Sequence, residues 1–264
     1  MPASIVLQIA NLQIPNLPST FPAVLILAFD TSGFAGSVAL LDGPALIREM
    51  ALAAERRSAQ TLSPAIASLL QESGVEPAQI KLVATTIGPG SFTGLRVGVT
   101  TAKTFAYAVG AQVLGISTLE AIAHGVSSEM LSTAPPEIHA VLDAQRRELF
   151  VGGFRVSDAA ISAADLPSLI RTQPDKIISA DDWLANLPPR TVVTGTGLAK
   201  LEARLPPDVV AAPHQSREPR AAVIGRLAWR DYQSGRRDDL WKLTPVYLRP
   251  SYAEEKAAKS TSPR

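Results

Sequence analysis

The chain has 264 residues, of which 46% are hydrophobic, so it can bury the core of one large domain or of two lobes. Its formal net charge of +1 provides no overall electrostatic attraction to nucleic acid or to a membrane surface. It contains no cysteine, which excludes a disulfide framework, a thiol nucleophile and a thiolate zinc site.

Both ends of the chain differ in composition from its middle. Residues 1–24 carry no lysine or arginine, and Pro15, Pro18 and Pro22 divide them into short pieces. A secretory signal needs a positively charged start and a membrane span needs a longer apolar run, so neither is indicated. We expect this segment to be a disordered N-terminal extension, and residues 250–264 to be a polar tail.

The first half of the chain alternates between strand and helix patterns. Apolar residues 24–30 predict a buried strand, and residues 36–43 predict a second strand that ends in a hairpin turn at Asp42-Gly43. Residues 80–88 and 111–117 predict two further strands. A helix is predicted between these pairs from the spacing of Leu62, Ile66, Leu69 and Leu70.

Two residues bear on the limits of that helix. Gly74 can end it, because glycine readily adopts the left-handed conformation after a last helical turn. Pro64 either begins the helix proper, with Ser63 as its N-cap, or kinks it.

The second half predicts a similar mixture of elements. Residues 138–154 indicate two strands joined by a charged turn, residues 190–197 a strand that runs into a glycine turn, and residues 220–234 a helix. The Pro-rich stretch 181–207 is interpreted as an irregular joint between subregions. Strands that alternate with helices and hairpins predict an α/β chain with a mixed sheet. Asp30 and Asp143 both follow apolar strands, and this echo suits two related lobes.

A glycine-rich turn and a helix follow the strand at 80–88, in the stretch IGPGSFTGLRVGVTTAKTFA. The glycine spacing matches neither a Walker A loop nor a dinucleotide-binding fingerprint, and Leu95 stands where Walker A requires lysine. Ser91 or Thr93 can cap the helix. The helix carries two stripes, an apolar one of Leu95, Val99, Ala102 and Ala106 and a second one of Gly94, Gly98, Thr101 and Phe105.

The second stripe contains two glycines, each of which costs a helix about 1 kcal/mol relative to alanine. Close approach of another element would offset that cost. The stripe therefore packs either inside the core of the chain or against another subunit.

Five strings occur in the order LAFDTSGFAGSVALLDG, TIGPGSFTGLRVGVTTAKTFA, GISTLEAIA, VTGTG and PVYLRP. Together they closely resemble the TsaB family, from about residue 25 to residue 250. The resemblance implies an actin-like (ASKHA) α/β fold with two ribonuclease-H-like lobes and mixed sheets. The first lobe would span residues 25–116, completed by 217–249, and the second lobe would span residues 117–216.

The resemblance also implies a function. TsaB proteins are partner subunits in the synthesis of threonylcarbamoyladenosine at position 37 of tRNA. This chain would accordingly be a non-catalytic, cytoplasmic subunit that dimerises with a TsaD homologue and is joined by a TsaE-like ATPase. It would meet tRNA only through the complex and would not contact a membrane. A homodimer of the chain alone is left open.

The resemblance assigns roles to two sets of residues. In this family the turn sets the start of a helix of the first lobe, and that helix and the preceding one pack against their counterparts in TsaD. The turn comprises Gly88, Pro89, Gly90, Ser91, Phe92 and Thr93. The expected interface comprises Leu62, Ile66, Leu69, Gly94, Arg96, Gly98, Thr101 and Phe105.

Metal chemistry is not indicated by the histidines. TsaD-like catalytic subunits hold a metal through two histidines four residues apart on one helix, a spacing that puts both on one face. His124, His139 and His214 contain no such pair, so we expect no metal site. The sequence also lacks the H-E-x-x-H and G-x-S-x-G patterns of peptidases.

Asp30, Thr31 and Ser32 are the candidates for nucleotide or Mg²⁺ contact, because strand-end aspartates have that role in actin-like kinases and ATPases. In the other interpretation Asp30 only caps nearby backbone amides. No firmly bound cofactor is expected, and weak ATP, ADP or Mg²⁺ binding would occur at the interface of the complex. The alternative function is a stand-alone small-molecule kinase or ATPase of the actin-like fold.

Overall fold

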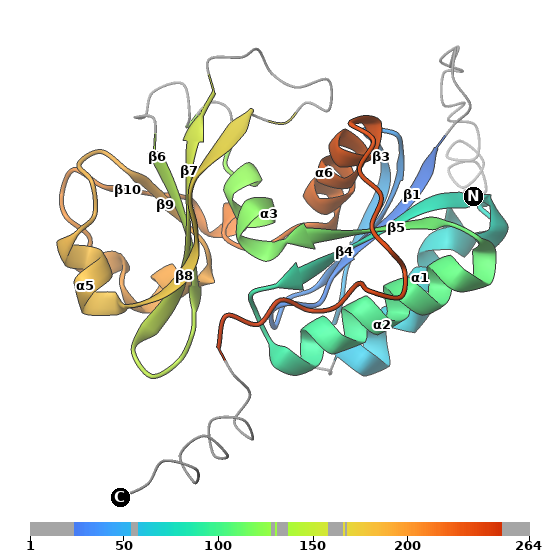
Figure 1. Cartoon of the computed structure of the whole chain (residues 1–264), viewed down its shortest axis with the longest axis horizontal. Helices are drawn as coiled ribbons and strands as arrows, with labels where there is room; N and C mark the ends of the chain where they lie inside the picture. The colour runs from blue at the N-terminus through green and yellow to red at the C-terminus, as the bar shows by residue number, and fades with distance from the viewer. Residues whose placement is uncertain are drawn as a thin grey trace, which may run out of the picture.

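The computed structural model describes residues 24–53, 58–127, 130, 137–157, 166 and 168–249, and the structural statements below concern those residues. Two five-stranded sheets lie side by side, each with helices on its faces (Figure 1). Nearly all of the predicted N-terminal extension lies outside the described residues, and so does the whole of the predicted polar tail.

The first sheet has the strand order β3-β2-β1-β4-β5. Its strands are β1 (Leu25–Asp30), β2 (Ser37–Asp42), β3 (Ala45–Ala51), β4 (Ile80–Gly88) and β5 (Gln112–Ser117). The first three strands form an antiparallel meander, and β4 and β5 run parallel to β1. Parallel strands need crossover connections, which α1 (Ser58–Glu72) and α2 (Phe92–Val109) provide.

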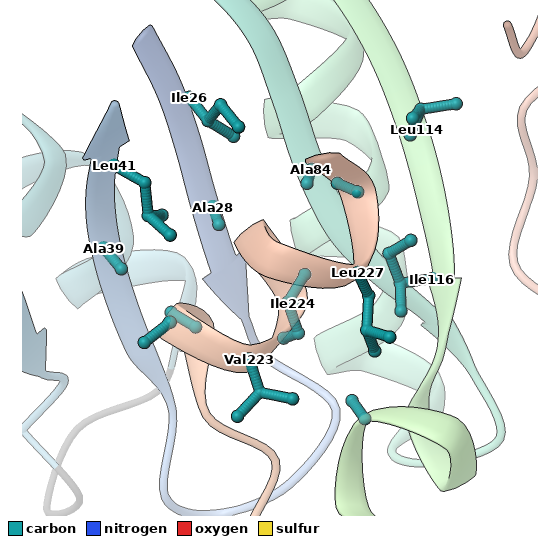
Figure 2. Close-up of a cluster of buried hydrophobic side chains, with 14 of the residues drawn as sticks. Ile26, Ala28, Ala39, Leu41, Ala84, Leu114, Ile116, Val223, Ile224 and Leu227 are labelled. Atoms are coloured by element: carbon teal, nitrogen blue, oxygen red, sulfur yellow. The ribbon is translucent and has the colours of Figure 1, made fainter. Parts of the chain in front are cut away.

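Alternate residues of these strands build two cores on opposite faces of the sheet. On one face, Leu27, Phe29 and Val83 pack with α1 and α2. On the other, α6 (Ala221–Gln233) lays Val223, Ile224 and Leu227 against the sheet, as Figure 2 shows. α1 and α2 therefore lie next to each other and present their remaining faces outward (Figure 1).

The second sheet repeats this topology, with the strand order β10-β9-β6-β7-β8. Its strands are β6 (Glu137–Asp143), β7 (Glu148–Val156), β8 (Leu169–Ser179), β9 (Val192–Thr194) and β10 (Val210–Ala211). Again the first three strands are an antiparallel meander, and the last two continue parallel to the first. Asp30 and Asp143 are the last residues of the equivalent strands β1 and β6, which confirms the similarity of the two lobes predicted from the sequence.

Helices also cover both faces of the second sheet. α5 (Ala180–Ala185) lies on its outer face, and α3 (Thr118–His124) lies between the two sheets (Figure 1). Short 3-10 helices complete the chain at Pro77–Gln79, Thr196–Lys200, Glu202–Arg204 and His214–Ser216. None of the helices in the described ranges combines the length and the hydropathy of a membrane span.

Two sequence-based interpretations of local structure are wrong. α1 begins at Ser58 and contains Pro64, so Ser63 is not an N-cap. The stretch 181–207 is not a joint between subregions, because it contains most of α5 and the whole of β9, both parts of the second lobe. Its prolines lie in the connections between these short elements rather than between lobes.

Candidate functional site

The glycine-rich turn at residues 88–93 packs directly on the end of β1. It opens with a cis peptide bond between Gly88 and Pro89. The Ser91 N–H donates to the carbonyl oxygen of Ser32 at 2.7 Å. The Ser91 hydroxyl accepts from the Gly94 N–H at 3.3 Å, so Ser91 is the N-cap of α2. A Cβ atom at Gly90 would lie 2.6 Å from the Ser32 carbonyl oxygen, so the turn fits this site only with glycine there.

The two helical glycines of α2 continue this close contact. A Cβ atom at Gly94 would overlap the carbonyl oxygen of Thr31. A Cβ atom at Gly98 would lie 2.5 Å from the Thr31 hydroxyl oxygen and 3.0 Å from that of Thr85. The Thr31 hydroxyl also donates to the Gly94 carbonyl at 2.7 Å. Gly94 and Gly98 were predicted to meet another subunit, and that prediction is wrong, because they meet β1 and β4 of their own lobe.

The apolar members of the expected interface are likewise internal. Leu62, Ile66 and Leu69 are 1%, 5% and 0% exposed and pack in the core beneath α1 and α2. Their assignment to an interface is wrong, because a side chain buried in its own lobe cannot contact a partner. Phe105 is half-buried and packs against the same core, and Thr101 is also half-buried. Of the expected interface residues, Arg96 is exposed.

The outward surface of α1 and α2 carries different residues, which we call the outer α1–α2 face. It comprises the exposed residues Gln60, Ser63, Pro64 and Ala67 of α1 and Thr93, Arg96, Thr100 and Thr104 of α2. Helices that face solvent usually carry charged residues on the exposed side. This surface has small, uncharged side chains apart from Arg96, and a lack of charge is typical of the centre of a protein interface.

An aromatic cluster borders this face at the start of α2. The Arg96 guanidinium lies 3.9 Å from the centroid of the Phe92 ring, and its Nε donates to the Tyr247 hydroxyl at 3.1 Å. The Phe92 and Tyr247 rings are 4.7 Å apart, and they are 38% and 40% exposed. Aromatic and arginine side chains are enriched at interfaces, so this rim extends the outer α1–α2 face.

The segment that carries Tyr247 is fixed to both lobes. The Val246 N–H donates to the Ile87 carbonyl at 2.7 Å, and Lys103 of α2 donates to the Leu243 carbonyl at 3.1 Å. At its end, Arg249 pairs with Glu148 at the start of β7 in the second lobe. The position of the aromatic rim is therefore set by contacts with α2, the end of β4 and the second sheet.

Asp30 is fully buried beneath the turn. Its Oδ1 accepts from the Thr86 hydroxyl at 2.6 Å and from the Ser32 N–H at 3.1 Å, whereas no hydrogen-bond partner for Oδ2 is found in the described ranges. Burial raises the pKa of Asp30 to about 6, and the bonds from Thr86 and Ser32 oppose that rise. Burial and the charge of Asp30 together raise the pKa of Glu218.

The polar groups around Asp30 are largely bonded to one another. The Thr31 hydroxyl donates to the Gly94 carbonyl, and the Ser32 N–H donates to the Asp30 carboxylate. The Ser32 carbonyl accepts from the Ser91 N–H. Asp30 caps a local amide, as in the second interpretation of the sequence. The described ranges contain no group of three potential metal ligands. Weak ATP, ADP or Mg²⁺ binding at the interface of a complex stays a prediction.

Asp30→Asn is expected to remove part of the pH dependence of folding. The ordinary pKa of this carboxyl is 3.8 and its folded value is about 6, so its ionisation weakens the folded state as pH rises between these values. The shift of roughly two units corresponds to about 3 kcal/mol. In urea denaturation, the free energy of unfolding of Asp30→Asn should rise by about that amount relative to that of the parent between pH 4 and pH 7. A constant difference between the two proteins across this range would contradict the assignment.

Comparison with known proteins shows which proteins the chain resembles. It is 28% identical to the tRNA threonylcarbamoyladenosine biosynthesis protein TsaB of Bacillus subtilis over 246 residues, covering 89% of this chain and 98% of that one. The chain is therefore similar to TsaB proteins over nearly its whole length. The TsaB protein of Escherichia coli is 33% identical over 125 residues, which cover 47% of this chain and 52% of that one. Residues 52–175 match the family model TsaD, tRNA N6-adenosine threonylcarbamoyltransferase.

A solved structure confirms the fold of the chain. It is a protein of Pseudomonas aeruginosa described as similar to peptidase YeaZ. It superposes with a TM-score of 0.69 at 27% identity, covering 86% of this chain and all of the other. The predicted actin-like α/β fold with two lobes and mixed sheets is thereby confirmed.

Proposed function

We propose that the chain is the non-catalytic partner subunit of a TsaD-like enzyme, which transfers threonylcarbamoyl to N6 of adenosine 37 in tRNA. The similarity to TsaB proteins and the match of residues 52–175 to the TsaD family model support this role. The observation that carries it is the outer α1–α2 face, two adjacent helices with small, nearly uncharged exposed side chains.

That face is suited to helix-on-helix docking. Packed helices approach to about 8–10 Å between axes, and small side chains such as those of Ser63, Ala67 and Thr100 permit such an approach. Because charge is nearly absent, docking would desolvate few ions. The partner's two equivalent helices would complete a four-helix contact, and Phe92, Arg96 and Tyr247 would form its rim.

The non-catalytic role has chemical support. The three histidines have no spacing that would place two on one helix face. The strand-end residues Asp30, Thr31 and Ser32 direct their hydrogen bonds into the chain itself. In this proposal the TsaD-like partner provides the catalytic groups, a TsaE-like ATPase joins the pair, and tRNA binds through the complex. A homodimer of the chain alone would use the same outer face and would be displaced by the partner.

The proposal is tested by reconstitution. The chain, the TsaD homologue of the same organism and both together are incubated with tRNA and threonylcarbamoyl-AMP, and threonylcarbamoyladenosine is quantified by mass spectrometry. We expect no steady product from the chain alone and a higher rate from the pair than from the TsaD homologue alone. Steady product from the chain alone would contradict the proposal. ATP turnover by the chain alone would favour the stand-alone kinase or ATPase instead.

A further inference from the structure

A concave site lies in the second lobe, away from the outer α1–α2 face. It is a cavity of about 330 Å³ on the side of the second sheet that carries α5. Its floor comes from β6, β7 and β8, through residues such as His139, Val151 and Lys176, and Trp183 of α5 forms part of its wall. A volume of this size suits a small metabolite.

His139 is the buried polar group of this cavity. The residue is 5% exposed, and the Trp183 indole N–H donates to its Nδ1 at 3.2 Å. Since Nδ1 accepts this bond, the proton of the neutral ring is on Nε2. Burial lowers the pKa of His139, the charge of Glu137 opposes this and Lys176 adds to it, so the net shift favours the neutral ring.

The Nε2–H of His139 is a buried donor that lacks an acceptor. No hydrogen-bond partner for it is found in the described ranges, and the Glu137 Oε1 lies 3.8 Å away, beyond hydrogen-bond distance. Buried donors in native proteins nearly always have a partner. Trp183 fixes the orientation of this donor, whose nitrogen lies buried beneath the surface of the cavity.

This arrangement excludes a metal ion at His139. A metal would need the lone pair of Nε2, but that atom carries the proton as long as Nδ1 accepts from Trp183. The ligand that fits is one with a hydrogen-bond acceptor.

The charges around the cavity narrow the class of ligand. Lys176 and Glu137 both line it, so a cation and an anion face the same space. A phosphate group would suit Lys176 but would be repelled by Glu137, and a simple amine would leave Lys176 and the His139 N–H without a partner. Thr172, Gln173 and Asn186 add neutral hydrogen-bonding groups.

We propose that this cavity binds a small zwitterionic metabolite of the amino-acid class. Its carboxylate faces Lys176 and lies above the buried Nε2–H of His139, and its ammonium group faces Glu137. The inference does not depend on the proposed role in tRNA modification, because none of these residues lies on the outer α1–α2 face.

Nuclear magnetic resonance of the ¹⁵N-labelled full chain tests the proposal. The chain has three tryptophans, so the Trp183 indole signal can be assigned with Trp183→Phe. Two zwitterions are titrated: L-alanine, in which the ammonium and carboxylate groups are close together, and 4-aminobutyrate, in which they are further apart. Butyrate and butylamine serve as half-ligands, and inorganic phosphate as an anion. We expect a saturable shift of the Trp183 signal with a zwitterion at a Kd of about 1 mM, and binding at least about tenfold weaker for each half-ligand.

Variants identify the charged groups. Lys176→Met and Glu137→Gln should each weaken zwitterion binding at least about tenfold. Lys200→Met is the matched control, because Lys200 is exposed, pairs with Asp143 and does not line the cavity, and it should leave binding unchanged. The remaining spectrum reports whether each variant is folded. The proposal is overturned if neither zwitterion gives a saturable shift, or if butyrate or phosphate binds as tightly as the zwitterions.

Discussion

Gly98→Leu is expected to destabilise the isolated chain by about 3 kcal/mol or more, a large part of the stability of an ordinary domain. The first added carbon would already lie 2.5 Å from the Thr31 hydroxyl oxygen, and the rest of the side chain would meet the end of β4 near Thr85. α2 would have to move away from the sheet and lose the contacts of Val99 and Ala102. Thermal melting of the purified chain measures the effect.

Thr100→Leu is the matched control for that variant. It places the same side chain two residues further along α2, at an exposed position of the outer α1–α2 face. Exposed substitutions usually change the free energy of unfolding by no more than about 0.5 kcal/mol, so the melting temperature should stay close to that of the parent. A Gly98→Leu chain that melts like Thr100→Leu would show that Gly98 does not face the sheet.

The second large effect is expected on binding. Ala67→Arg combined with Thr100→Arg puts two long charged side chains on the outer α1–α2 face, one on each helix. Docking would then have to desolvate two unpaired cations, so we expect affinity for the TsaD homologue to fall at least about a hundredfold, or about 3 kcal/mol. Calorimetric titration of the parent and the variant against the purified partner measures this loss.

Gln233→Arg serves as the control for the added charge. Gln233 is exposed at the end of α6, on the opposite face of the first sheet. Both variants should melt like the parent, and Gln233→Arg should bind like it. An unchanged affinity for the Ala67→Arg, Thr100→Arg chain would place the partner elsewhere on the molecule.

The sequence predicts most elements of the first lobe because these have local signals, whereas β3 was not predicted. The predicted strand at 80–88 coincides with β4, and Ser91 caps α2 as its position before the helix suggests. The strings from LAFDTSG to PVYLRP span both lobes, which is why the fold could be expected from the resemblance.

The orientation of α2 was not predictable in the same way. The sequence shows a stripe with Gly94 and Gly98 that must meet something closely, but a helical pattern does not say whether that neighbour is internal. The neighbour is Thr31, 63 residues away from Gly94 in the chain, and only the fold brings it there. The surface left for a partner consequently lies between the two stripes. It carries mainly threonine and other small residues, which form no periodic pattern in the sequence.

The cavity of the second lobe had no sequence signal for a similar reason. His139 is one of three isolated histidines, and Trp183 lies in a stretch that was interpreted as an irregular joint. Their contact depends on the pairing of β6, β7 and β8 and on the short helix α5. Lys176 and Glu137 meet there through the same pairing, 39 residues apart in the chain.

The absence of cysteine permits the most direct test of the central claim, that the outer α1–α2 face binds the TsaD-like partner. Ala67→Cys, Thr100→Cys and Gln233→Cys each introduce one thiol, and its rate of modification by a maleimide is measured with and without saturating partner. The account predicts at least about tenfold slower modification at positions 67 and 100 in the complex and an unchanged rate at position 233. Unchanged rates at positions 67 and 100 in a chain that demonstrably binds the partner would contradict it.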